Sequence, residues 1–144
     1  MKYDKPLVAI LLSIIGSIPV VIYHEIMKFF NLLNVGLLEG SSMMFIPEGS
    51  IYLGFLSAAG YSAVLGLILY YSPKLLGRDH FVLKSLFIGM VIEALFFVIF
   101  GTLGRNENLL VGPVSHYILA AGAALGGASR GYLIKANLFP RERK

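Results

Sequence analysis

Long apolar runs alternate with short polar segments along this chain, and the runs have the length of membrane-spanning helices. The first two runs hold no charged residue, the third holds Lys84 and Glu93, and the fourth holds Arg130. Apolar runs of about 18 or more residues are typical of transmembrane helices, and none of these runs alternates as a strand would. The pattern predicts an all-α integral membrane protein with four transmembrane helices, at residues 6–23, 50–72, 81–103 and 112–134.

The segments between the runs predict how the helices pair. The second and third connections are short, so neighbouring spans should form two antiparallel hairpins. Pro73 is expected to end the second span, and Pro19 to kink the first. Residues 24–49 are too apolar for a solvated loop and carry polar positions at helical spacing, which predicts an interfacial helical segment after the first span. We expect residues 1–144 to form a single membrane domain with a cytoplasmic tail at 135–144.

Composition supports the same class of protein. The chain is 57% hydrophobic and only 14% charged, with a mean hydropathy of +0.78, whereas soluble domains are about 25% charged. Cysteine is absent, which excludes disulfides, thiolate metal sites and cysteine nucleophiles. The net charge of +4 lies in short flanks between apolar runs, a pattern of membrane orientation and not of a nucleic-acid-binding face.

The distribution of basic residues predicts the orientation. Of the 12 lysines and arginines, only Lys28 and Arg105 fall on the side of the first and third connections, and the other ten share the side of both termini. The positive-inside rule therefore places both termini in the cytoplasm of a cell whose plasma membrane the chain crosses several times. The basic start and apolar run at 1–23 also resemble a signal peptide, but no cleavage pattern follows closely, so we expect the segment to be retained.

Small residues recur on two of the spans at the spacing that allows close helix packing. One set follows an i, i+4 ladder on the second span and the other is glycine-rich and lies on the fourth: Gly54, Ala58, Ser62 and Gly66, and Gly122, Gly126, Gly127 and Gly131. We expect these faces to pack tightly, whereas the phenylalanine-rich third span should face lipid or fill grooves.

Glu93 is the strongest candidate for chemistry, because it lies at the centre of the third span. An acid at this depth is costly, and it suggests either a proton or cation site or a neutral structural lock between helices. Tyr61 lies at a similar depth in the second span, together with Ser13, Ser17 and Ser62, and could bond to it. No second buried acid completes a proton relay.

Two other groups of residues suggest weaker hypotheses. His24, Glu25 and His116 lie at one depth on the outer side and could bind the metal ion of an interfacial enzyme. However, the sequence His-Glu-Ile-Met-Lys lacks the second histidine of the zinc-protease pattern. Lys84, Arg130 and Lys135 lie near the inner side, where they could bind an anionic lipid headgroup or simply reach the interface.

The segment Gly77-Arg78-Asp79-His80, followed by Lys84 and Gly89, together with Ser115-His116 and the glycine-rich fourth span, resembles small four-helix prokaryotic membrane proteins of unknown function. The resemblance covers about half of the chain. It implies a bacterial cell membrane and carries no activity with it.

The sequence thus predicts a non-enzymatic structural or accessory subunit of a membrane assembly. The alternatives are a small cation or proton channel or transporter using Glu93, and the metal enzyme described above. The expected partners are the lipid bilayer and either further copies of the chain or another membrane subunit, with no nucleic acid, no resident metal and no cofactor.

Overall fold

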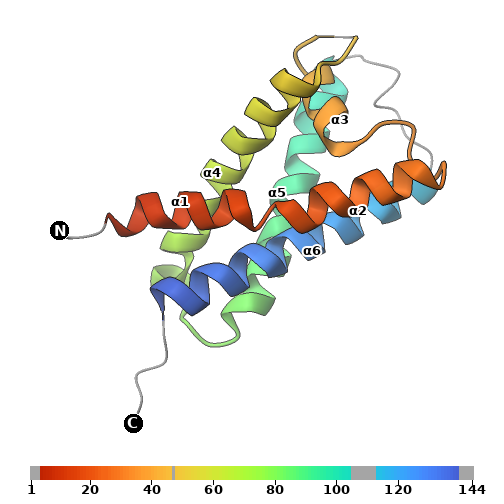
Figure 1. Cartoon of the computed structure of the whole chain (residues 1–144). Coiled ribbons are helices and arrows are strands. Elements are labelled where there is room, and N and C mark those ends of the chain that lie inside the picture. Colours follow the sequence, from red (N-terminus) through yellow and green to blue (C-terminus); the bar gives the residue numbers. More distant parts are fainter. Residues whose placement is uncertain (1–3, 47, 105–112, 140–144) are drawn as a thin grey trace.

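The computed structural model describes residues 4–46, 48–104 and 113–139, and every regular element in these ranges is an α-helix (Figure 1). The all-α prediction is therefore confirmed for the described residues. The predicted third connection and the end of the tail lie outside them. The helices are α1 (Lys5–Ile15), α2 (Ile18–Phe29), α3 (Leu37–Met43), α4 (Ile51–Leu76), α5 (Phe81–Gly104) and α6 (Pro113–Leu138).

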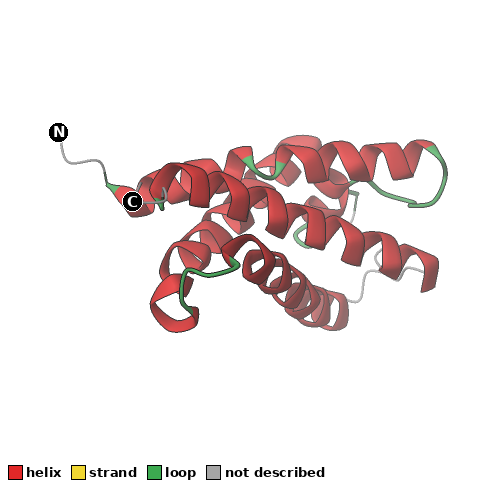
Figure 2. Cartoon of the chain, turned by 90° about the horizontal axis from the view of Figure 1, so that it is seen from below, coloured by secondary structure: helices red, strands yellow, loops and turns green. Residues whose placement is uncertain are grey.

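The helices pack as two crossing pairs. α1 and α2 follow one another along a common line with α6 beside them, and α4 and α5 cross this layer (Figures 1 and 2). The most extensive packing joins α5 to α6 and α1 to α4. The start of α1, the turn between α4 and α5 and the end of α6 gather at one end of the molecule, and α3 lies at the other (Figure 1). α5 packs extensively against α6, as the third connection predicted, whereas α4 and α5 make little contact despite the short turn between them.

The first predicted span is broken in the middle, between α1 and α2. The Ser17 amide donates to Ile14 O, three residues back, and the Val20 amide donates to Ser17 O. Pro19 lies in the first turn of α2, where its missing N–H and its ring are tolerated because a new helix starts there. The predicted kink is thus present, as a break at residues 16–17, and it diverts the carbonyls of Ser13 and Gly16 from the normal helical ladder.

The prediction that Pro73 ends the second span is wrong. α4 continues through Pro73 to Leu76 and ends at Gly77, whose φ is +75°. A proline at this position removes the hydrogen bond to Leu69 O. The hydroxyl of Ser72 donates to that same oxygen at 2.9 Å and replaces the lost bond, so the helix keeps its last turn.

The last turns of α6 also extend beyond their expected limit, since the helix runs to Leu138 and includes the start of the predicted tail. Phe139, directly after it, stacks on Tyr70 with ring centroids 6.1 Å apart and meets Phe81 edge-on at 5.6 Å. These contacts hold the C-terminal end of α6 against α4 and α5, next to the apolar core formed by Ala9, Leu65, Leu69, Phe81 and Ile134.

Two stretches of the described chain are long and apolar enough to cross a membrane, namely Lys5–Phe29 and Ile51–Leu76. In each of them only 22% of the most apolar window is buried within the molecule. Most of their apolar side chains are therefore exposed or only partly buried, which is unusual for the core helices of a soluble protein.

Candidate functional site

Glu93 and Tyr61, the two candidates for an ion or proton site, meet inside the bundle. The hydroxyl of Tyr61 on α4 donates to Glu93 Oε2 on α5 at 3.3 Å. The Tyr61 ring also packs edge-on against Phe96, with centroids 5.1 Å apart. The expected contact between the second and third spans is therefore present.

Arg130 also belongs to this group, which the sequence did not predict. Its side chain is 5% exposed. Its Nε donates to Ser13 O at 3.3 Å and its Nη2 to Ser62 Oγ at 3.1 Å, and the guanidinium lies 6.0 Å from the centre of the Tyr61 ring. Arg130 was expected at the inner interface beside Lys84 and Lys135. Its burial removes it from that surface and joins α6 to α1 and α4 instead.

Helix geometry explains why Arg130 points inward. Side chains on a helix tilt toward its N-terminus, so Arg130 extends back along α6 over Gly126. A Cβ on Gly126 would collide with Arg130 Nη1, so the glycine leaves this path open for the arginine. The break in the first span supplies the acceptors, because Ser13 O is outside the helical ladder. Gly16 O is similarly bonded to the hydroxyl of Ser129, one residue before Arg130, at 2.5 Å.

These residues line a cavity of about 90 Å³ between the helices. A water needs about 10–15 Å³ of such volume, so this space holds several waters or a small solute. Its titratable lining side chains, among the described residues, are Tyr61, Glu93 and Arg130. Glu93 and Arg130 face the same space but make no direct ion pair. The cavity is thus a mostly apolar compartment that contains one acid and one base.

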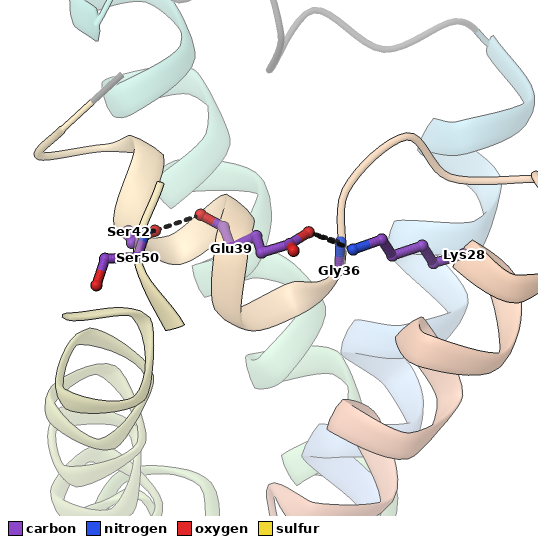
Figure 3. A network of polar contacts seen from close by, with 5 residues as sticks. All are labelled: Lys28, Gly36, Glu39, Ser42 and Ser50. Atoms are coloured by element: carbon purple, nitrogen blue, oxygen red, sulfur yellow. Dashed lines mark hydrogen bonds and ion pairs between the residues drawn. The ribbon is translucent and has the colours of Figure 1, made fainter. Parts of the chain in front are cut away.

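The outer segment at residues 33–44 covers one end of the cavity, because Leu33 to Leu37, Gly40, Ser41 and Met44 contribute to its lining. This segment is fixed by a network around α3 (Figure 3). Lys28 Nζ lies 2.5 Å from Glu39 Oε2, which also accepts from the Gly36 amide at 3.3 Å. The hydrogen bond from Lys28 lowers the pKa of Glu39. The Ser42 hydroxyl donates to Glu39 O and accepts from the Ser50 amide, both at 2.7 Å.

The three residues of the metal hypothesis do not come together. His24 is 1% exposed and is bonded through Nδ1 to Val20 O at 2.9 Å, the side chain of Glu25 lies against Gly36, and His116 is exposed. No three histidine or acidic side chains of the described ranges lie close enough to share a metal ion. Nε2 of His24 is enclosed without a hydrogen-bond partner, against Gly122 of α6.

The small residues of α4 and α6 pack closely against several other helices. On α4, a Cβ at Gly66 would lie 2.7 Å from Ser13 Cβ of α1, and one at Gly54 would collide with Leu38 O of α3. On α6, a Cβ at Gly122 would lie 2.5 Å from the His24 ring, and one at Gly127 would lie 2.8 Å from Leu86 Cα. Close packing is present at these glycines, and it joins α4 to α1 and α3, and α6 to α2 and α5. Gly131 of α6 likewise meets Ser85 of α5.

Lys84 lies at the turn between α4 and α5. It donates to Leu76 O and lies 3.4 Å from Asp79 Oδ2. These contacts complete the turn, and Lys135 is half-buried in the last turns of α6. Headgroup binding by Lys84 and Lys135 stays a prediction.

Comparison of the chain with protein-family models, with curated proteins and with solved structures found no match in any of the three. The site is therefore interpreted from its own geometry.

Proposed function

We propose that the chain is a four-span integral membrane protein whose bundle encloses a binding site for a small polar solute and a proton, as in a small channel or transporter. In this proposal, the α1–α2 pair, α4, α5 and α6 are the four spans, and both termini are cytoplasmic, as the distribution of lysine and arginine predicts.

The outer surface supports the membrane part of this proposal. On α5, Leu83, Phe87, Val91 and Leu95 follow at every fourth position and are each 53–59% exposed. Such a continuous apolar stripe would be costly in water at about 25 cal/mol per Å² of apolar surface. Hydrocarbon solvates it without that cost, which is why we assign α5 as a span alongside Lys5–Phe29 and Ile51–Leu76. In this proposal α6, which packs along α5, is the fourth span.

The single observation that carries the functional proposal is that Glu93 and Arg130 face a shared cavity without forming a direct ion pair. Ionisable residues inside a membrane are rare, and those that line a cavity usually belong to a pathway or a proton site. Broken helices are tolerated at membrane depth where they line such a cavity, and the break at Gly16–Ser17 lies against Arg130. Four spans are few for a complete transporter, so we expect several copies to assemble.

A second candidate function has its own observation. Arg130 bonds to α1 through Ser13 O and to α4 through Ser62 Oγ, and the Ser13 hydroxyl donates to Ser62 O at 2.6 Å. These bonds join α1, α4 and α6, as expected if Arg130 and the two serines hold the helices together in an accessory subunit.

Access of water to the cavity separates the two functions. The chain has no cysteine, so single cysteine variants give unambiguous labelling. We expect Ser57→Cys, which lines the cavity, to react with a small water-soluble methanethiosulfonate in membrane vesicles. The matched control is Ser85→Cys, because Ser85 is 0% exposed between α5 and α6 and lies outside the cavity lining.

Labelling of Ser57→Cys at a rate well above that of Ser85→Cys would support the solute-binding site. Equal inertness of both cysteines, in vesicles of either orientation, would show that the cavity is sealed from water and would leave the structural lock as the function.

A further inference from the structure

The guanidinium of Arg130 has donors that the protein does not use. Nε and Nη2 each donate to the protein, at Ser13 O and Ser62 Oγ, whereas Nη1 has no hydrogen-bond partner among the described residues. Among the described residues, His24 Nε2 is the one side-chain polar atom that is fully buried and has no hydrogen-bond partner. Arg130 Nη1 also has no partner, so it cannot be fully buried and must retain some accessible surface, although Arg130 as a whole is 95% buried. Arg130 is one of the residues that line the cavity.

The charges around the cavity decide which solute fits. Its described lining holds one acid, Glu93, one base, Arg130, and the phenol of Tyr61. Three further titratable groups lie next to this lining: His24 of α2, which contacts Gly122 of α6, Glu25 of α2, whose carboxylate lies against Gly36, and Glu39 of α3, which is paired with Lys28. With Glu93 ionised the compartment is neutral. A lone added charge, of either sign, would be costly in this low-dielectric interior.

We propose that the cavity binds a small monovalent carboxylate together with one proton, with Arg130 holding the anion and Glu93 taking the proton. This inference rests on the proposed function. The proton comes from water and converts the Glu93 carboxylate to a carboxylic acid, so the compartment stays neutral when the anion enters. No other bond forms or breaks.

The donors near Glu93 suit a carboxylate. Guanidinium groups bind carboxylates with short, directional hydrogen bonds. A protonated Glu93 would add an O–H donor beside the hydroxyl of Tyr61, which lies 3.3 Å from its Oε2. The cavity volume of about 90 Å³ is large enough for small carboxylates such as formate or acetate.

A cation does not satisfy the same conditions. It would bind beside Glu93 while Arg130 remains in the same compartment, so the bound state would carry an uncompensated positive charge. Release of a proton cannot correct this, because an arginine keeps its proton in proteins. When Glu93 is initially ionised, entry of an anion together with one proton leaves the charge of the compartment unchanged.

The test is calorimetric titration of the full-length protein in detergent with sodium formate and sodium acetate. Titration in two buffers of different ionisation enthalpy gives the number of protons taken up. We expect uptake of about one proton per anion by the wild type, and affinity that falls by up to about tenfold per pH unit between about pH 6 and pH 8, because ligand and proton binding are linked.

Three variants assign the roles. Glu93→Gln mimics the protonated acid, and we expect it to bind formate without proton uptake and without pH dependence. Arg130→Lys keeps the charge but loses the planar set of donors, and we expect affinity to fall at least about tenfold. Lys135→Met, on the same helix and outside the cavity lining, is the matched control and should bind as the wild type does. Circular dichroism confirms that each variant is folded.

Several results would overturn the inference: no binding of formate or acetate by the folded wild type, unchanged proton uptake in Glu93→Gln, unchanged affinity in Arg130→Lys, or binding of chloride or methylammonium in preference to the carboxylates. Each of these leaves the cysteine-labelling result intact. A water-accessible cavity that binds no carboxylate would therefore disprove this inference and not the proposed function.

Discussion

Gly16 and Arg130 touch at the point where the broken first span crosses α6. A Cβ on Gly16 would lie 2.8 Å from Cγ and 2.9 Å from Cα of Arg130. The absence of a side chain at residue 16 therefore lets α6 approach closely enough for Arg130 Nε to reach Ser13 O and for the Ser129 hydroxyl to reach Gly16 O.

Replacing Gly16 should separate these helices. We expect Gly16→Ala to destabilise the folded protein by about 1–3 kcal/mol, because one of the blocking atoms is backbone and cannot rotate away. Unfolding in mixed detergent micelles, followed by circular dichroism, measures the effect. The matched control is Gly60→Ala in α4, where a Cβ meets nothing within 4 Å. That variant should be neutral or more stable, by up to about 1 kcal/mol, because alanine is the better helix former. Equal stability of the two variants would contradict the close contact.

The helices were predictable from the sequence, because long apolar runs rarely form any other structure. The positions where the helices break or end were less predictable. Pro19 indicated the break, since a proline inside a span disrupts the hydrogen-bond ladder. Pro73 likewise indicated the end of a helix, but the helix continues past it. The hydrogen bond from the Ser72 hydroxyl to Leu69 O cannot be seen in a pattern of hydrophobicity.

The candidate site was predictable in part. Depth alone paired Glu93 with Tyr61. Arg130 was misplaced because its position near the end of a span suggested a side chain extended toward the cytoplasm. The missed signal was Gly126, four residues earlier, which leaves room for an arginine tilted toward the N-terminus of its helix. Its acceptors on α1 and α4 depend on tertiary packing, which no local pattern reports.

The packing of α5 against α6 gives the second prediction. A Cβ on Gly127 would collide with Ser85 O and lie 2.8 Å from Leu86 Cα, and both of these are backbone atoms. We expect Gly127→Ala to lower the free energy of unfolding by about 1–3 kcal/mol, and Gly127→Val to lower it further. The same micelle assay measures both variants, with Gly60→Ala as the control. If Gly127→Ala instead unfolds like the wild type, α5 and α6 must lie further apart than described here.

The pair of Lys28 and Glu39 predicts a pH dependence for the outer segment. Hydrogen bonding from Lys28 lowers the pKa of Glu39 from its reference value of 4.5. A lowered acid pKa contributes stability above the reference value, and this contribution is lost as pH falls through the folded-state value. Both side chains are more than a third exposed, so we expect less than about 1 kcal/mol. Hydrogen exchange of α3 amides, measured at about pH 6 and about pH 4, should accelerate at the lower pH.

The control for that experiment is Lys28→Met, which removes the partner of Glu39. In this variant α3 should exchange faster at about pH 6, and the additional acceleration at low pH should be smaller than in the wild type. An identical pH response in both proteins would mean that the ion pair does not hold the segment over the cavity.

The proposed topology gives a fourth prediction, again through the absence of native cysteines. Lys28→Cys lies near the end of α2 and Lys135→Cys near the end of α6. We expect a membrane-impermeant maleimide added to intact cells to label residue 28 and not residue 135, and inverted vesicles to give the reverse result. Labelling of both residues from the same side would be incompatible with four spans and cytoplasmic termini.

The coupling of Glu93 with Arg130 gives the last prediction. Arg130→Met leaves an acid in the bundle without its base and leaves the Ser13 carbonyl without a donor, so we expect a loss of about 3–5 kcal/mol of stability. Glu93→Gln keeps the shape and should cost less. In the double variant no charge remains in the cavity, so its loss should be smaller than the sum of the two single losses by at least about 1 kcal/mol. Unfolding of all four proteins in the same micelles measures this difference. Additive losses would mean that the two groups do not interact across the cavity, and the charge argument for a proton and an anion entering together would then fail.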